Sequence, residues 1–267
     1  MVHPGGPARR LPPLTVMAWL RFDAIRRAVG TVDPQSVLEL GCGEGAMGAW
    51  MAARTAEYTG VEPDPTARAT AAARVAVLPG ARVVASLDDT AGLAVVLACA
   101  FEVLEHVEDD VALLQMLRSR IRPGGSLLLS VPAHPDRYGA SDELVGHFRR
   151  YARADLTGRL GRAGYDLVAI ESYGTGAGHV LDRLQDALAA RRMATAPSAH
   201  AGGATPPSAS DDVGTPGSGR YLQPGSAAGA AVRAGVAAPF RVVQRPFRHT
   251  DAGVGFVALA RADRPAG

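Results

Sequence analysis

The first group of residues that could do chemistry is a carboxylate followed by three glycines at alternate positions, Glu39-x-Gly41-x-Gly43-x-Gly45. Glycine lacks a Cβ, so this spacing lets the backbone turn tightly and come into contact with a ligand. A carboxylate just before the turn suits a ligand that carries a cationic amine, and it would repel a pyrophosphate. With Cys42 in the same turn, the group predicts a cofactor site at the end of an apolar strand.

The same stretch also fits a second cofactor pattern. Gly43, Gly45 and Gly48 have the G-x-G-x-x-G spacing of a dinucleotide-binding turn, which alone is a weak signal. Glu62 ends the next predicted strand, where a carboxylate can accept hydrogen bonds from both hydroxyls of a ribose. This contact suits a dinucleotide as well as the amine-bearing cofactor, so it does not separate the two. An NAD(P)-dependent oxidoreductase is therefore the alternative, together with a tight turn that binds no ligand.

A histidine stands in the second group, within Leu-Glu-His-Val at residues 104–107. The group follows the strongly apolar stretch 92–100, whose length and branching suit a buried central strand. Phe101 and Glu102 come directly after this stretch, and we expect them to contact the cofactor. His106 is a candidate general base because the pKa of imidazole lies near neutrality, and a purely structural histidine is the alternative.

A polar stretch of unusual length, 132–150, forms the third group. Loops this long are uncommon in a compact domain unless they serve a site, so we expect this one to form the wall of a substrate pocket. His147 is the second candidate base. Arg149 and Arg150 could bind a carboxylate or phosphate, or else pair with the acids of the stretch itself. The expected substrate contacts are His134, Arg149, Arg150 and Tyr151.

These three groups need a scaffold that brings strand ends together. Short apolar runs alternate with helical patterns, which favours an α/β fold in which ligands bind at the carboxyl ends of parallel strands. Ser86 and Leu87 lie at one such end, where we expect them beside an adenine ring. The predicted strands are 37–40, 57–62, 81–87, 92–100, 126–131, 165–173 and 255–262, and the predicted helices are 14–29, 46–53, 66–77, 111–121, 154–163, 180–193 and 227–243.

The composition limits the classes of function. The chain has 267 residues, 47% of them hydrophobic, and its formal charge of +2 implies no general attraction to nucleic acid or to a membrane. Its two cysteines, Cys42 and Cys99, form no disulfide framework and no zinc site, which favours a reducing cytoplasm and a chain without a metal. No apolar run reaches the roughly 18 residues of a membrane helix, and no secretory signal is expected.

The combination of motifs resembles the class I S-adenosylmethionine (SAM) methyltransferases, in particular the small-molecule methyltransferases with a Leu-Glu-His-Val segment. The resemblance is carried by the glycine motif 39–45, by 104–107, by Arg-Pro-Gly-Gly at 122–125 and by Gly-His-Phe-Arg-Arg-Tyr at 146–151. It implies a Rossmann-like three-layer sandwich with a seven-stranded, mostly parallel sheet and an antiparallel last strand. It also implies SAM as the cofactor, with Glu39 near the methionine amino group.

By the same resemblance, we expect in-line transfer of a methyl group to a small-molecule acceptor, with O-methylation favoured and His106 or His147 as the base. An NAD(P)-dependent oxidoreductase and a protein that binds SAM without catalysis are the alternatives. The sequence names neither the acceptor nor the oligomeric state.

The domain organisation follows from the same pattern. We expect an N-terminal arm and helix at 1–30 and one methyltransferase domain at 31–267. An insertion at about 174–250 would interrupt this domain. Its segment 194–219 is rich in Ser, Pro, Gly and Ala, and we expect it to be disordered because it has too few large apolar side chains to bury.

Overall fold

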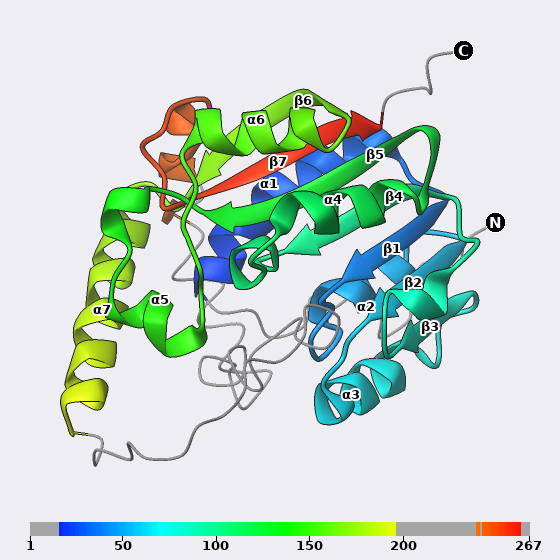
Figure 1. The fold of residues 1–267 in the computed structure, drawn as a ribbon, viewed down its shortest axis with the longest axis horizontal. Coiled ribbons are helices and arrows are strands. Elements are labelled where there is room, and N and C mark those ends of the chain that lie inside the picture. Colours follow the sequence, from blue (N-terminus) through cyan, green and yellow to red (C-terminus); the bar gives the residue numbers. More distant parts are fainter. Residues whose placement is uncertain (1–15, 196–238, 241, 263–267) are drawn as a thin grey trace.

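The computed structural model describes residues 16–195, 239–240 and 242–262. One seven-stranded sheet runs through this part of the chain, with helices packed on it (Figure 1). The strands are β1 Ser36–Leu40, β2 Glu57–Val61, β3 Ala81–Val84, β4 Val95–Phe101, β5 Ile121–Pro132, β6 Tyr165–Tyr173 and β7 Gly255–Ala262. The helices are α1 Val16–Val32, α2 Ala46–Ala52, α3 Pro65–Val75, α4 Asp110–Arg118, α5 Ala140–Val145, α6 Arg153–Arg162 and α7 Ala177–Thr195.

The strands lie in the order β3-β2-β1-β4-β5-β7-β6. β1 pairs in parallel with β2 and β4, whereas β7 pairs antiparallel with both β5 and β6. The predicted fold class, a Rossmann-like α/β sandwich with an antiparallel last strand, is confirmed. Successive strands are added on one side of β1 as far as β3, and from β4 onward on its other side. The carboxyl ends of β1 and β4 therefore form the topological switch point at which such sheets bind ligands.

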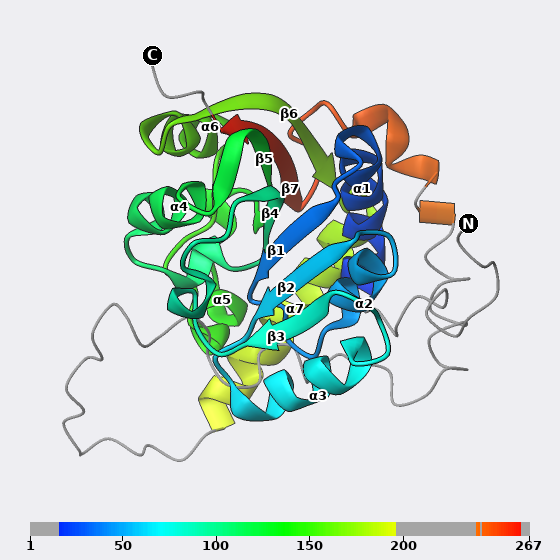
Figure 2. The same cartoon turned by 90° about the vertical axis from the view of Figure 1, so that its right-hand side faces the viewer.

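Both faces of the central strand β4 are covered, which explains its apolar sequence. Leu97, Ala98, Cys99 and Ala100 are all fully buried. Because side chains alternate along a strand, the sheet contributes to two separate hydrophobic cores. One core includes side chains of α4 and α6, and the other includes side chains of α1 and α2. Figure 2 shows α1 and α4 on opposite sides of the sheet.

Aromatic contacts hold α1 against α2. Trp19 and Phe22 of α1 meet edge to face with ring centroids 5.8 Å apart, and Phe22 meets Trp50 of α2 in the same way at 5.1 Å. Such pairs contribute about 0.5–1.5 kcal/mol each beyond the apolar area that they bury. The same helix carries Arg21, whose guanidinium pairs with Glu102 just after β4 at 2.8 Å. Packing of α1 therefore places a cation beside the switch point.

Some boundaries differ from the predicted ones, for local reasons. α1 continues past Gly30, because packing of the helix outweighs the cost of about 1 kcal/mol that a glycine imposes on it. β5 begins at Ile121 rather than at the predicted residue 126, because the Arg-Pro-Gly-Gly segment 122–125 lies within the strand. The pairing with β4 shifts register there before it resumes at Ser126. The stretch 132–150, predicted as a loop, contains the short helix α5.

Helices α5 and α7 pack on each other and lie beyond the carboxyl ends of β4 and β5 (Figure 1). The segment 194–219, predicted to be disordered, lies outside the described residues from 196 onward, and so does the predicted helix 227–243 as far as 238. The predicted insertion and domain boundaries therefore stay predictions. Within the described ranges, no helix combines the length and the apolar character needed to cross a membrane.

Candidate functional site

The glycine turn follows β1 and has a backbone conformation that other residues rarely adopt. Gly41, Gly43 and Gly45 have positive φ angles of 69°, 55° and 75°. The turn is fixed to β2, because the amides of Gly41 and Cys42 both donate to the carbonyl of Val61, at 2.9 and 3.1 Å. The predicted motif therefore lies at the carboxyl ends of β1 and β2, where the sheet topology places a ligand.

The three glycines have different surroundings. A Cβ at Gly45 would come within 2.9 Å of the Cα of Ala71 in α3, and one at Gly41 would come within 2.7 Å of the Val103 side chain. A Cβ at Gly43 would meet nothing within 4 Å. Gly41 and Gly45 are therefore needed for close packing, whereas Gly43 borders open space that a ligand can occupy.

Glu39 precedes this turn in β1, and its side chain is buried. Its carboxylate accepts a hydrogen bond of 2.6 Å from the hydroxyl of Tyr58. A Cβ at Gly48 would lie 2.1 Å from that hydroxyl, so the glycine that completes the dinucleotide spacing is explained by packing alone. Burial raises the pKa of Glu39 to about 8, although the hydrogen bond from Tyr58 opposes the shift. A nearby ligand cation would favour the ionised carboxylate.

Glu62 follows β2 and joins that strand to the glycine turn. Its two carboxylate oxygens accept hydrogen bonds from the backbone N–H groups of Gly43 at 2.8 Å and Asp64 at 3.0 Å. Each oxygen has capacity for a further donor, as a contact with ribose hydroxyls requires. Partial burial raises the pKa of Glu62, and the two backbone hydrogen bonds oppose that shift.

Ser86 and Leu87 lie in the turn after β3, which ends at Val84. The Ser86 amide donates to the Asp89 carboxylate at 2.9 Å, and the Asp89 amide donates to the Ser86 hydroxyl at 3.4 Å. Leu87 is buried in the core that includes α4 and α6. This geometry makes Ser86 part of a capped turn and leaves Leu87 little exposed face, so their contact with an adenine ring stays a prediction.

Glu102 directly follows β4 in a left-handed conformation, with φ of 56°. One of its carboxylate oxygens pairs with Arg21 at 2.8 Å and accepts hydrogen bonds from the hydroxyls of Ser130 at 2.9 Å and Tyr173 at 3.3 Å. Phe101, the last residue of β4, is half-buried beside it. The sequence prediction missed Arg21, although the signal was present as an arginine on the helix before β1. A guanidinium at this edge can also bind a carboxylate of a ligand.

Glu105, His106 and His147 form a polar cluster after β4. Glu105 is fully buried, and neither of its carboxylate oxygens has a hydrogen-bond partner within the described chain. Nε2 of His147 lies 4.0 Å from Oε1 of Glu105. The rings of His106 and His147 meet edge to face with centroids 4.6 Å apart. The two predicted bases therefore lie side by side, although they are distant in the sequence.

Burial controls the ionisation of this cluster. It raises the pKa of Glu105 well above its usual range, and the nearby charge of Glu102 acts in the same direction. Burial also lowers the pKa of His106 to about 4, with a further contribution from His147. His106 is therefore neutral at about pH 7 and carries an unprotonated ring nitrogen.

Asp142 of α5 holds His147 in place. Nδ1 of His147 lies 2.7 Å from Oδ1 of Asp142, and the His147 amide donates to the Asp142 carbonyl at 2.9 Å. Arg150 also pairs with Asp142, at 2.8 Å, and reaches Asp182 of α7 at 3.1 Å. Burial opposes ionisation of Asp142, but the hydrogen bond from His147 and the charge of Arg150 bring its pKa below the usual value.

Three of the predicted substrate residues are engaged within the protein. Arg150 is buried in the two pairs just described, and Arg149 pairs with Asp110 at 2.9 Å. Tyr151 is fully buried, and its hydroxyl donates to Asp110 at 2.8 Å. The prediction that Arg150 and Tyr151 contact the substrate is corrected by this geometry, because their polar groups are enclosed and already paired. Arg150 follows the alternative prediction in its pair with Asp142, an acid of the same stretch, whereas Arg149 pairs with Asp110 outside it.

His134 takes a different position, directly after β5. It has a positive φ of 66°, and its Nε2 lies 2.8 Å from the carbonyl of Gly253. Its ring faces that of His179 on α7, with centroids 6.2 Å apart. A substrate contact by His134 stays a prediction, since the observed contacts connect it to the loop before β7.

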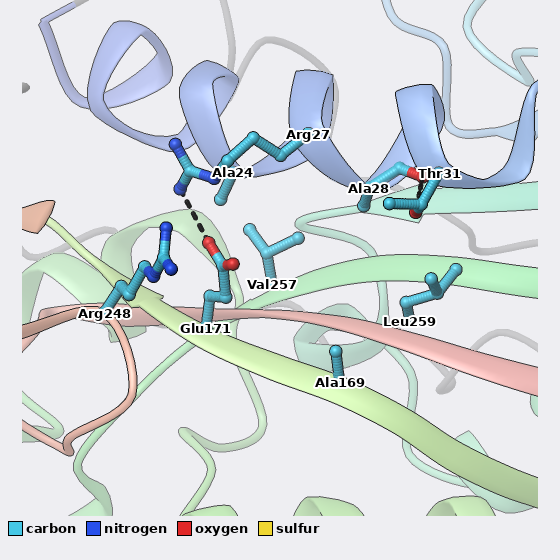
Figure 3. A pocket seen from close by; sticks show the side chains of 9 residues that line it. All are labelled: Ala24, Arg27, Ala28, Thr31, Ala169, Glu171, Arg248, Val257 and Leu259. Carbon is cyan, nitrogen blue, oxygen red and sulfur yellow. Dashed lines mark hydrogen bonds and ion pairs between the residues drawn. The ribbon is translucent and has the colours of Figure 1, made fainter.

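A pocket between α1 and the strands β6 and β7 lies apart from this site (Figure 3). Arg27 and Glu171 form an ion pair of 2.6 Å at the pocket, and Val257 and Leu259 line its floor. None of the site residues predicted from the sequence lines it. We therefore assign the functional site to the carboxyl ends of the strands.

Comparisons with known proteins identify the family of this chain. Residues 17–170 match a family model described as a methyltransferase domain. A ubiquinone biosynthesis O-methyltransferase of Leptothrix cholodnii is 29% identical over 133 residues, which are 46% of this chain and 55% of the relative. The corresponding protein of Aeromonas salmonicida is 31% identical, over 47% of this chain and 56% of its own length. The chain thus spans about half the length of these curated relatives.

Solved structures show the same fold at low identity. A SAM-dependent methyltransferase from Mesorhizobium loti is 15% identical with a TM-score of 0.53, over 91% of this chain and 97% of that one. The cyclase SpnF is 17% identical with a TM-score of 0.55, over 93% of this chain and 82% of that one. At these identities the likeness concerns the fold, which can host more than one chemistry.

The glycine turn supports a matched pair of variants. Gly43→Ala should weaken binding of S-adenosylhomocysteine at least tenfold, because the new methyl group enters the space assigned to the cofactor, and should cost about 1–2 kcal/mol of stability through its positive φ. Gly45→Ala has the same backbone cost and should lose about 1–3 kcal/mol of further stability, since its Cβ would overlap Ala71. Calorimetry and chemical unfolding measure both effects. Unchanged affinity in Gly43→Ala would place the cofactor elsewhere.

Proposed function

We propose that this chain, which belongs to the class I SAM-dependent methyltransferase family, transfers the methyl group of SAM to a hydroxyl oxygen of a small-molecule acceptor. The observation that carries the proposal is the close contact between Gly41 of the glycine turn and the side chain of Val103. Val103 lies two residues before Glu105, which forms the polar cluster with His106 and His147. A cofactor on the turn would therefore have polar groups next to it that can act on a hydroxyl.

In this proposal the turn and its two acids hold the cofactor. Glu62 would accept the ribose hydroxyls, and Glu39 would face the methionine amino group from below the turn. Arg21, the cation beside Glu102, would balance the carboxylate of the same methionine group. The ligand charges and the protein charges then alternate along the edge of the sheet, which is the arrangement that favours binding of a zwitterionic group.

The transfer itself is an in-line displacement. The acceptor oxygen attacks the methyl carbon, the carbon–sulfur bond breaks, and its electron pair stays on sulfur to give S-adenosylhomocysteine. Because the sulfonium is already activated, the protein mainly aligns the two partners, an effect worth up to about 7–11 kcal/mol. A hydroxyl acceptor must also lose its proton, and the histidine pair forms the polar centre at which this proton is removed.

Exposed aromatic side chains support an aromatic acceptor. Phe148 follows His147 and is 55% exposed, and Tyr138 is 39% exposed. The hydroxyl of Tyr138 donates to the carbonyl of His147 at 2.6 Å, which keeps its ring beside the histidine. The O-methyltransferase names of the two curated relatives also favour an oxygen acceptor. A phenolic or catecholic hydroxyl is therefore our proposed acceptor class.

Cofactor binding is expected to release a proton at about pH 7. Glu39, with a pKa of about 8 in the free protein, is mostly protonated there, and the cofactor ammonium would lower that pKa. Titration calorimetry with S-adenosylhomocysteine in buffers of different ionisation enthalpy measures the release. Glu39→Gln keeps an acceptor for Tyr58 but cannot ionise, so its binding enthalpy should not depend on the buffer. The same buffer dependence in both proteins would contradict the role of Glu39.

Methyl transfer is tested with tritium-labelled SAM and a panel of phenols, catechols and amines. The wild-type protein should label hydroxyl acceptors and leave amines unlabelled. His106→Ala and His147→Ala should each lower turnover at least about 100-fold while the affinity for S-adenosylhomocysteine stays within about threefold. His249→Ala removes an exposed histidine outside the cluster and should behave as wild type. Full turnover in both cluster variants would refute their assignment.

A further inference from the structure

We propose that Glu105, His106 and His147 bind a divalent transition-metal cation through one carboxylate oxygen and two imidazole nitrogens. The ligand atoms that these side chains offer all lie within 4.8 Å of one another. The inference rests on the proposed function only for the reaction step that the cation would assist. The binding site itself stands on burial, missing hydrogen bonds and side-chain orientation.

The buried carboxylate of Glu105 is the first reason. Its side chain is 0% exposed, and both oxygens lack a hydrogen-bond partner within the described chain. An ionised carboxylate is very costly to bury unless it is paired or coordinated to a metal, and without such a partner it stays protonated. The neighbouring cation, Arg21, is already paired with Glu102. A metal ion in the cluster would take the place of the proton on Glu105.

The orientation of the histidines is the second reason. A metal-bound histidine almost always bonds its other ring nitrogen to a carboxylate, a backbone carbonyl or water. Nδ1 of His147 is bonded to Asp142 at 2.7 Å, which leaves Nε2 facing Glu105. The ring of His106 meets that of His147 edge to face, and its Nδ1 has no hydrogen-bond partner among the described residues. His147 therefore offers Nε2 to the cluster while Asp142 holds its other nitrogen, and His106 offers an unpartnered Nδ1.

The donor set indicates which ions would fit. Imidazole ligands favour ions such as Zn²⁺, Fe²⁺ and Ni²⁺ over Ca²⁺. Bonds of about 2.1 Å place neighbouring ligand atoms about 3.4 Å apart, so small side-chain rotations would close the 4.0 Å between His147 and Glu105. The sequence prediction of a chain without a metal was based on the two cysteines. The ligands proposed here come from two distant segments that only the fold brings together.

Three protein ligands leave coordination positions open for the acceptor. Coordination lowers the pKa of a bound hydroxyl, as it does for bound water, so the acceptor proton would leave to solvent. The coordinated oxygen would then attack the methyl carbon of SAM, and the electron pair of the broken bond would stay on sulfur. The cation is neither oxidised nor reduced in this step, and the histidines act by holding it.

Binding of Co²⁺ tests the site without reference to activity. The full chain is freed of metal with a chelator and titrated with Co²⁺, and the visible absorption of the bound ion is followed. Wild type should bind one ion per chain, and Glu105→Gln and His147→Ala should bind at least about tenfold more weakly. His249→Ala, the matched histidine outside the cluster, should bind as wild type. No binding by wild type, or equal binding by wild type and Glu105→Gln, would overturn the site.

Thermal unfolding separates loss of the ligand from loss of the fold. Glu105→Gln replaces a buried carboxylate with a neutral group of the same shape, so it should melt no lower than the metal-free wild type, and Co²⁺ should raise the melting temperature of wild type alone. Cobalt binding without methylation of any acceptor would refute the proposed function and leave the site standing. Full methylation by chelator-treated protein that binds no cobalt would refute the site and leave the function standing.

Discussion

The functional part of the molecule depends on the close approach of a left-handed glycine turn to the backbone and side chains around it. The turn after β1 is hydrogen-bonded to the end of β2 and lies against Ala71 of α3 and Val103 after β4. Any larger residue at Gly41 or Gly45 would push these elements apart. Because Val103 leads directly into Glu105 and His106, the same contact fixes the distance between the cofactor turn and the polar cluster.

Buried and half-buried acids at the carboxyl ends of the strands are the second constraint, and those described for the site have partners apart from Glu105. The partners are Tyr58 for Glu39, backbone amides for Glu62, Arg21 for Glu102, His147 and Arg150 for Asp142, and Arg149, Tyr151 and Arg159 for Asp110. The oxygens of Glu105 have no hydrogen-bond partner within the described chain. This contrast makes the cluster around Glu105 the place where we expect a cation to replace the proton of a buried carboxyl group.

The sequence predicted the parts of the fold that depend on local pattern. The glycine motif and the apolar strands β1, β4 and β7 were foreseen because their signals are short-range, whereas the antiparallel direction of β7 came from the family resemblance. The pairs of Arg149 and Tyr151 with Asp110, and that of Arg150 with Asp182, could not be foreseen, since they join segments that meet only in the folded chain. The approach of His147 to Glu105 depends on the fold in the same way.

The most direct test of this account is a calorimetric titration of the purified chain with S-adenosylhomocysteine and, separately, with NADH. We expect binding of S-adenosylhomocysteine with no binding of NADH, because the amino group of the first ligand favours the ionised form of Glu39 and pairs with it, whereas NADH carries no such cationic group. Binding of NADH alone would contradict it, and would show that Gly43, Gly45 and Gly48 serve a dinucleotide instead.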